Sequence, residues 1–266
     1  MERDERELGG AWTRFQRHEF AAPAPDLAPF VDHYWMVEWD YATPYRQVIV
    51  PYPHVQLSTG PAGEFAVHGV ASGHQLKVLD GRGRVFGIAF RPGGFRPFLG
   101  SSVAALTDRS VPAADITALP PGGPADPFAM ASVEGWLRRA LPAPDPAAAR
   151  AAEIVAMIAC EPTVLRADRL AAQCGTGLRS LQRLFAEYVG VGPKWVIRRY
   201  RLHEVTERMA AGAVIDWAGL AADLGYADQA HFTRDFTSMF GEPPTRYAQR
   251  YPAAQERFSG PRPARR

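Results

Sequence analysis

LAADLGYADQAHFTRDF at residues 220–236 and LAAQCGTGLRSLQRLF at residues 170–185 are two copies of one pattern, about fifty residues apart. Each copy predicts a short helix that begins with Leu-Ala, a turn at Gly225 or Gly175, and a longer helix with apolar residues at helical spacing. A helix-turn-helix unit has this order and places its second helix in the major groove of DNA. An ordinary amphipathic surface helix would explain one copy equally well, but two copies favour a DNA-binding protein.

The spacing within the two longer helices separates an inward face from an outward face. The residues predicted to pack inward are Leu178, Leu181, Phe185 and Tyr188 in the first copy and Phe232, Phe236 and Phe240 in the second. The opposite faces carry Arg179, Gln182, Arg183 and Ala186 in the first copy and Ala227, Ala230, His231 and Arg234 in the second. Arg and Gln bond bidentately to guanine and adenine edges, and a small Ala permits close approach.

Residues 193–211 predict a spacer helix between the two copies, beginning at Pro193 and ending before Gly212. Its apolar side carries Trp195, Leu202, Val205 and Met209. At the standard rise this helix is ~27 Å long, and successive major-groove faces on one side of DNA are ~34 Å apart. With its two turns, the spacer is therefore expected to hold the two reading helices in neighbouring grooves.

Residues 148–250 resemble the DNA-binding domain of the AraC/XylS transcription regulators, a seven-helix pair of helix-turn-helix units. The matching motifs are LxRLFxxxVGxxPKxxxRxxR at residues 181–201 and LAxxxGYxDQAHFxRDFxxxFGxxPxxY at residues 220–247. The resemblance implies base or backbone contacts from two sets of residues, which are Arg179, Ser180, Gln182 and Arg183, and Ala227, Ala230, His231 and Arg234. The first unit departs from the pattern at Arg166, where an N-cap such as Ser or Thr is expected.

Residues 10–118 consist of short apolar runs, rich in β-branched and aromatic residues and separated by Gly, Pro or Asp. This pattern predicts an antiparallel β-barrel or jelly-roll domain, with a short helix at residues 95–100. The fold class expected is therefore a two-domain α+β chain with an all-α DNA-binding domain. The motifs FGIAFRPGGFRPFLG and LTDRSVP resemble an uncharacterised N-terminal domain found on one branch of AraC-type regulators.

We expect four segments along the chain. Residues 1–120 form a β-rich sensor domain, residues 121–147 a linker with a helix, residues 148–250 the double helix-turn-helix, and residues 251–266 a disordered tail. The linker helix around Trp136 is expected either to pack on the barrel or to form a dimer contact.

The expected role of the N-terminal domain is to bind an unknown small-molecule effector, since small barrels can enclose one ligand. Aromatic residues in strands are candidates to line its pocket, although such residues more often belong to the core. An arginine before Pro-Gly-Gly is a candidate to bind an anionic group of the effector, although an exposed or ion-paired arginine is the simpler explanation. The effector candidates are Trp35, Tyr52, Phe86 and Arg91.

Nothing in the sequence predicts a metal, a cofactor or a catalytic centre. His54, His68 and His74 lack a metal-ligand spacing and the cupin pattern, and no nucleophile elbow or triad order is present. Cys160 and Cys174 are expected to be structural. We therefore expect a protein that is not an enzyme and that has no metal site and no cofactor.

The charge is divided between the two halves. Residues 147–266 hold 17 Lys plus Arg against 12 Asp plus Glu, a net of +5, while residues 1–146 hold 13 against 16, a net of −3. This division suits phosphate binding by one domain. No stretch approaches ~20 consecutive apolar residues, and the start MERDERELGG has no apolar core, so we expect a cytoplasmic protein without membrane contact.

The function expected is a sequence-specific transcription regulator, an activator or a repressor, that responds to an effector through its N-terminal domain. The expected partners are double-stranded DNA, RNA polymerase and the effector, with a homodimer as a further possibility. One alternative is a constitutive DNA-binding protein whose N-terminal half only dimerises or contacts RNA polymerase. The other is a cupin-like enzyme with a DNA-binding appendage.

Overall fold

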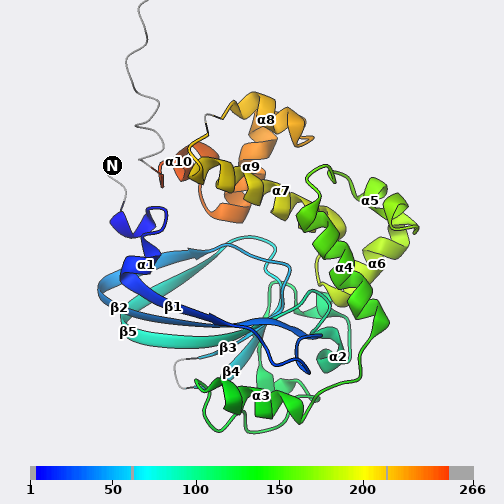
Figure 1. Ribbon diagram of the computed structural model, residues 1–266. Helices are drawn as coiled ribbons and strands as arrows, with labels where there is room; N and C mark the ends of the chain where they lie inside the picture. The colour runs from blue at the N-terminus through cyan, green and yellow to red at the C-terminus, as the bar shows by residue number, and fades with distance from the viewer. Residues whose placement is uncertain (1–3, 61–62, 214, 252–266) are drawn as a thin grey trace, which may run out of the picture.

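The computed structural model describes residues 4–60, 63–213 and 215–251. A β-rich N-terminal part is followed by a helical C-terminal part, so the expected α+β fold class is confirmed. Figure 1 shows helices α4–α10 gathered on one side of the sheet and α3 on the other. Of the predicted tail at residues 251–266, all but Tyr251 lies outside the described residues.

One antiparallel sheet of six strands forms the N-terminal part, in the order β1-β2-β5-β3-β4-β6. Two long strands, β2 and β5, pair along most of their length, and the others are short. The bounds are β1 Gln16–Ala21, β2 Val31–Ile49, β3 Gln56–Thr59, β4 Phe65–His68, β5 Gln75–Phe90 and β6 Ser110–Pro112.

The sheet is open, which differs from the closed barrel that was one form of the expected β domain. Within the described residues no ladder joins β1 to β6, so these strands are its two edges. The edge strand β6 is three residues long and ends at Pro112, which has no N–H to donate to a further strand. Helices rather than a second sheet therefore cover the inner face.

The inner face of the sheet is covered by α3 (Met130–Arg138), together with the shorter α2 (Arg96–Leu99), η2 (Val103–Leu106) and η3 (Ala113–Asp115). Trp136 of α3 is 1% exposed, stacks on Phe65 and donates from Nε1 to the Pro120 carbonyl at 2.8 Å. Of the two roles expected for this helix, packing on the sheet is therefore the observed one. The domain boundaries themselves stay a prediction.

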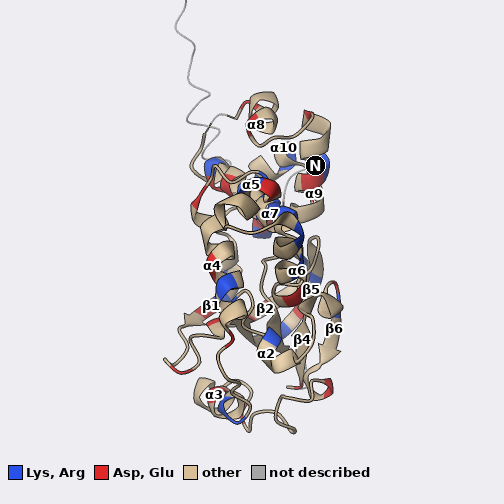
Figure 2. Ribbon diagram, turned by 90° about the vertical axis from the view of Figure 1, so that its right-hand side faces the viewer, with Lys and Arg blue, Asp and Glu red and all other residues tan. Residues whose placement is uncertain are grey.

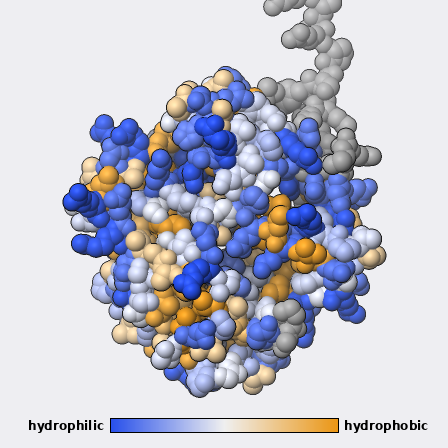
Figure 3. Space-filling model, turned by 180° about the vertical axis from the view of Figure 1, so that it is seen from behind, coloured by the Kyte–Doolittle hydropathy of each residue, from blue (hydrophilic) through white to orange (hydrophobic). Residues whose placement is uncertain are grey.

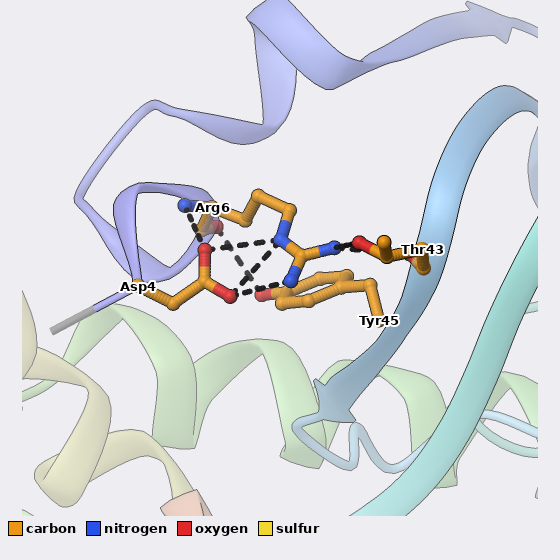
Figure 4. Close-up of polar contacts among 4 residues, drawn as sticks. All are labelled: Asp4, Arg6, Thr43 and Tyr45. Carbon is orange, nitrogen blue, oxygen red and sulfur yellow. Dashed lines mark hydrogen bonds and ion pairs between the residues drawn. The ribbon is translucent and has the colours of Figure 1, made fainter.

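The N-terminal segment, with η1 (Glu5–Glu7) and α1 (Trp12–Phe15), is attached to β2. Figure 4 shows Arg6 between the Asp4 carboxylate, at 2.6 Å from Nη2, and the Thr43 carbonyl, to which Nη1 donates at 3.1 Å. The Tyr45 hydroxyl donates in turn to the Arg6 carbonyl at 3.2 Å. These contacts hold the segment beside the sheet.

Seven helices follow residue 145 in the described part of the chain, the number that the family resemblance implies. Their bounds are α4 Pro146–Cys160, α5 Ala167–Gln173, α6 Leu178–Tyr188, α7 Pro193–Ala210, α8 Trp217–Asp223, α9 Gln229–Phe240 and α10 Pro244–Ala248. Their apolar faces share one core, in which Val196, Leu202 and Val205 of α7 are fully covered. The face seen in Figure 3 carries apolar residues in separate patches among hydrophilic ones.

Candidate nucleic-acid interface

The first helix-turn-helix unit consists of α5, a turn at Gly175 and α6. Gly175 has a left-handed φ of +63°, which residues with a Cβ rarely adopt, so glycine suits this tight connection. Leu181 and Phe185 are fully buried as predicted, whereas Leu178 is 39% exposed. Leu178 differs because it is the first residue of α6, where no preceding turn of the helix covers it.

The outward face of α6 carries the predicted contact residues Arg179, Ser180, Gln182 and Arg183, and all four are exposed. Within the described residues, neither Arg179 nor Arg183 has an ion pair or a hydrogen bond for its guanidinium group. Exposed guanidinium groups without an internal partner keep all their donors for an external acceptor. This helix face could therefore bind phosphate or base edges.

The second unit consists of α8, a turn at Gly225 and α9. The Asp228 side chain caps α9 by accepting from the His231 N–H at 2.7 Å, whereas α6 begins at Gly177 without a side-chain cap. The aromatic stripe predicted to pack inward is buried, with Phe236 and Phe240 stacked at 4.6 Å between ring centroids. On the outer face lie Ala227, Ala230 and Arg234, all exposed, and the half-buried His231.

Arg234 of α9 corresponds to Arg183 of α6. Each arginine lies two residues before a buried phenylalanine, Phe236 in α9 and Phe185 in α6. Like Arg183, Arg234 has no ion pair among the described residues. Figure 2 shows basic segments of the helical part interleaved with acidic ones, in keeping with the modest net charge of this half. The outward faces of α6 and α9 therefore each present an exposed arginine without an ion pair in the described residues, whatever the total charge of this half.

The spacer helix α7 extends from Pro193 to Ala210, close to the predicted bounds, and two of its arginines are bonded to other helices of this half. Arg198 donates from Nη1 to Asp235 Oδ1 of α9 at 3.1 Å. Arg201 donates to the Ile158 carbonyl of α4 and is nearly fully buried. Both arginines are therefore used inside the helical half, and Arg198 ties the spacer to the reading helix α9.

The C-terminal ends of both reading helices contact the N-terminal domain. The last carbonyls of a helix have no partner within it, and side chains of the β-rich part supply donors. Ser102 Oγ donates to the Ala186 carbonyl of α6 at 3.1 Å. The backbone N–H and ring Nδ1 of His74 each meet the Ser238 carbonyl of α9 at 2.9 Å.

Two further contacts strengthen the attachment of α6. Thr107 Oγ1 donates to the Gly190 carbonyl at 2.5 Å, and Arg96 Nε lies 2.6 Å from Glu187 Oε1. Ala186 and Glu187 are neighbours at the end of α6, and Gly190 lies two residues beyond it, so the end of α6 and the residues that follow have partners in the N-terminal domain. The same domain therefore holds one end of each reading helix.

The spacer helix also contacts the N-terminal domain, through Trp195 and Arg199. Trp195 Nε1 donates to the Ser72 carbonyl at 2.7 Å. Arg199 is 1% exposed, donates from Nε to the Pro51 carbonyl at 2.5 Å, and stacks 4.0 Å from the centroid of the Tyr52 ring. Burial lowers the pKa of Arg199.

Sequence reasoning missed Arg199, although a signal was present. Arg199 lies four residues after Trp195 and three before Leu202, so it belongs to the apolar stripe already assigned to this helix. A positively charged residue within a buried stripe indicates that neighbouring groups replace the water it loses. Here these groups are a carbonyl and an aromatic ring.

The four predicted effector residues lie in different places. Phe86 is buried in the core and stacks on Tyr34. Trp35 pairs with Gly87 rather than Phe86, so it projects from the opposite face, where it leaves no space for a Cβ on Gly87. Tyr52 lies at the domain contact beside Arg199, and Arg91 donates to the Ala28 carbonyl at 3.4 Å. These residues do not line one common cavity.

The three histidines considered as metal ligands have separate surroundings. His68 lies between the hydroxyls of Ser58 and Ser110, at 2.9 and 2.8 Å, while His74 is bound to α9. Burial lowers the pKa of His54 to about 4. In the part of the chain that the structure describes, no group of three or more His, Cys, Asp or Glu side chains could hold a metal ion.

The two cysteines differ in exposure. Cys160 is exposed at the end of α4, and Cys174 is half-buried, where burial raises the pKa of its thiol. Across residues 4–60, 63–213 and 215–251, no helix is long and apolar enough to cross a membrane.

Two family models match separate parts of the chain. Residues 19–112 match a model described as a domain of unknown function (DUF6597), and residues 170–250 match one described as a helix-turn-helix domain. The second match includes both reading helices and the spacer. No curated protein matches the chain.

Several solved structures are similar to the chain. The C-terminal domain of AraT, a response regulator from Geobacillus stearothermophilus, is 18% identical, with coverage of 40% of this chain and 85% of that chain and a TM-score of 0.33. ToxT from Vibrio cholerae is 12% identical, with coverage of 89% and 99% and a TM-score of 0.38. ToxT bound to (E)-4-(8-methylnaphthalen-1-yl)but-3-enoic acid is 11% identical, with coverage of 89% and 99% and a TM-score of 0.40.

Proposed function

We propose that the chain regulates transcription by reading double-stranded DNA with α6 and α9 in the major groove, since residues 170–250, which contain both helices, match the model of a helix-turn-helix domain. The proposed contacts come from Arg179, Ser180, Gln182 and Arg183 on α6, from Ala227 in the turn before α9, and from Ala230, His231 and Arg234 on α9. The observation that carries this proposal is that each reading helix presents an exposed arginine without an internal partner, on the face opposite its buried stripe.

The arginines and the small residues would have different roles in DNA recognition. A guanidinium group bonds bidentately to guanine, and an amide side chain such as that of Gln182 bonds bidentately to adenine. Ala227 and Ala230 let the start of α9 approach the bases closely, while Arg234 supplies the charge. Domains of this type are DNA-binding regulators, so we propose no catalytic role for the chain.

Alanine substitution of the two equivalent arginines tests the proposal. On a site selected by the full chain from random DNA, Arg183→Ala and Arg234→Ala should each weaken binding by roughly 1–3 kcal/mol and relax the preference at one base position. Arg139→Ala, at an exposed position next to α3, removes the same charge far from the readers and should leave affinity unchanged. Fluorescence anisotropy titrations at one fixed salt concentration would measure all three.

Unchanged affinity in both reader variants would sink the assignment of α6 and α9 as reading helices. Gross unfolding of Arg183→Ala in a thermal melt would instead identify Arg183 as a structural residue.

We further propose that the N-terminal domain makes DNA binding responsive to a small-molecule effector. Coupling requires that the effector bind one state of the protein more tightly than the other. The contacts of Ser102, Thr107 and His74 with the ends of α6 and α9 support this proposal, because a change in the sheet domain would alter the relative placement of the two readers. DNA affinity that no ligand alters would favour the constitutive alternative. RNA polymerase, a second copy and a cytoplasmic location stay predictions.

A further inference from the structure

A groove of about 720 Å³ opens on the N-terminal domain, away from the two reading helices. It is formed by α1 and the adjoining parts of β1, β2 and β5, and its lining consists of residues 13–17, 38–40 and 82–84. None of the effector candidates predicted from the sequence belongs to this lining. The groove is therefore a separate site whose chemistry follows from its own residues.

The strand register places charged residues of the groove on one face of the sheet. Arg17 pairs with Glu38, and Glu38 pairs with Arg84 across the next ladder. Asp40 pairs with Arg82, one step further along the same face. Residues that pair directly, and residues two apart on one strand, project to the same side. This is the face that buries Tyr34 and Phe86 nearer the core, so the groove begins where the apolar covering ends.

The arginines of the groove are only partly neutralised. Four arginines, Arg14, Arg17, Arg82 and Arg84, line it against two carboxylates, Glu38 and Asp40. Arg17 has acidic partners, with Nη2 2.5 Å from Glu19 and Nη1 3.9 Å from Glu38. In the described part of the chain, Arg14, Arg82 and Arg84 have no ion pair.

The orientation of Arg84 leaves its donors available. Its guanidinium lies over the Phe128 ring, 3.8 Å from the centroid. Stacking engages the flat face of the guanidinium and leaves the N–H groups at its edge for an acceptor in the same plane. This excess of positive charge lies in a half of the chain whose net charge is −3 (13 basic against 16 acidic residues at 1–146), so it is local to the groove rather than a property of the domain.

We propose that this groove binds a small organic anion that carries two separated carboxylate or phosphate groups with hydroxyl groups between them. Arg82 and Arg84 are two residues apart on one strand, a separation of ~6.6 Å, and Arg17 lies two strands away from Arg84, at ~9.6 Å. These are separations between Cα atoms, and arginines spaced in this way can hold two anionic groups of one ligand. Glu38 lies between Arg17 and Arg84, and Asp40 lies beside Arg82. Both carboxylates accept hydrogen bonds, which suits hydroxyl donors in the middle of the ligand.

The inference deepens the proposed function and rests on it, because it names the chemical class of the effector. Binding of the anion is measured without DNA, however, so the groove can fail as a site while DNA reading stands, and the reverse. Citrate and fructose 1,6-bisphosphate serve as probes, since both carry separated anionic groups and hydroxyls, one with carboxylates and the other with phosphates.

Isothermal titration of the full chain at constant ionic strength tests the proposal. At least one probe should bind with a stoichiometry of one, and inorganic phosphate should bind at least tenfold more weakly. Arg82→Ala should weaken binding at least tenfold. The matched control is Arg46→Ala, which removes an exposed arginine of β2 outside the groove and should leave binding unchanged. Circular dichroism melts of both variants show whether each is folded, and Arg82→Lys provides a second, milder variant.

Three outcomes would overturn the proposal. The first is that neither probe binds. The second is that a variant outside the groove weakens binding as much as Arg82→Ala does. If Arg46→Ala does so, the anion associates with positive charge in general, and if Arg183→Ala does so, it associates with the reading helices. The third is inorganic phosphate binding as tightly as the two probes, which would contradict the requirement for two separated groups.

Discussion

Arg199 is the residue at which charge and burial conflict most strongly in this protein. Its guanidinium has a carbonyl and an aromatic ring as partners but no carboxylate, and its Nη1 atom has no acceptor in the described residues. Removing a charge from water costs several kcal/mol unless other groups compensate. The contact between α7 and the β2–β3 connection therefore combines a buried charge, which destabilises it, with packing, which stabilises it.

Replacing Arg199 by an apolar residue of similar length should consequently be tolerated. We expect Arg199→Met to change the free energy of unfolding by less than ~1 kcal/mol, in either direction. Tyr52→Ala, which keeps the cation but removes the ring above it, should lower the same quantity by about 2 kcal/mol. Urea denaturation of both variants checks this, and a loss above ~3 kcal/mol in Arg199→Met would show that the buried charge stabilises the contact.

His54 makes the stability of the chain depend on pH. Burial lowers its pKa to about 4 in the folded protein, whereas the unfolded chain has the ordinary value near 6.5. As the pH falls through this interval, the unfolded state binds the proton first, so stability present above pH ~6.5 is lost toward pH ~4. We expect a loss on the order of 2 kcal/mol from this residue. Denaturation of wild type and His54→Gln at pH 7 and pH 4.5 should show a smaller loss in the variant, and equal losses would contradict the burial of His54.

At the scale of elements, the ends of α6 and α9 are completed by another domain. An isolated helix leaves its last carbonyls to water or to a local cap, but here Ser102 and His74 reach them from the loops of the sheet domain. The same helices present their opposite ends to DNA in the proposed function. Each reading helix is thus a rigid connection between the sheet domain and the DNA-facing surface.

Removal of a side-chain donor should loosen one of these ends without unfolding the chain. His74→Ala keeps the backbone bond to Ser238 and deletes the ring bond, at a cost of about 1 kcal/mol. Hydrogen exchange should become faster at residues 238–241, where the end of α9 is no longer held. Ser110→Ala, which removes a hydroxyl bonded to His68 within the sheet domain, serves as the control and should leave that segment unchanged.

At the scale of the whole molecule, the sheet domain extends further along the chain than its strands do. Although β6 ends at Pro112, the core beneath the sheet includes Val133, Trp136 and Leu137 of α3, all at 0–1% exposure. A fragment that ends at residue 120 would therefore expose the apolar face of the sheet. The helix belongs physically to the sheet core, even though a Pro/Gly-rich stretch separates it from the strands.

Fragment length should show this directly. Residues 1–145 should give a cooperative thermal transition, whereas residues 1–120 should bind a hydrophobic dye and aggregate because a buried face is uncovered. In the full chain, Trp136→Ala should lower the free energy of unfolding by about 3–5 kcal/mol. A cooperative transition of the shorter fragment at the same temperature would refute this assignment of α3.

Much of the helical half could be predicted because its signals are local. The periodicity of Phe232, Phe236 and Phe240 and the turn glycines each depend on residues within one or two helical turns. The placement of effector candidates could not be predicted in this way. Trp35 and Phe86 look alike in sequence, yet the ladder between β2 and β5 sends them to opposite faces.

By itself, the sequence determined the paired helix-turn-helix units, the spacer helix from Pro193 and the exposed arginines on α6 and α9, since helical periodicity sorts side chains into buried and exposed faces without distant information. Only the tertiary structure decided that the sheet stays open, that α3 completes its core, that Arg199 is buried, and that four arginines from two distant segments line one groove. The reason is that strand register and domain contacts join residues far apart in the chain, and no local pattern encodes which partner will meet them.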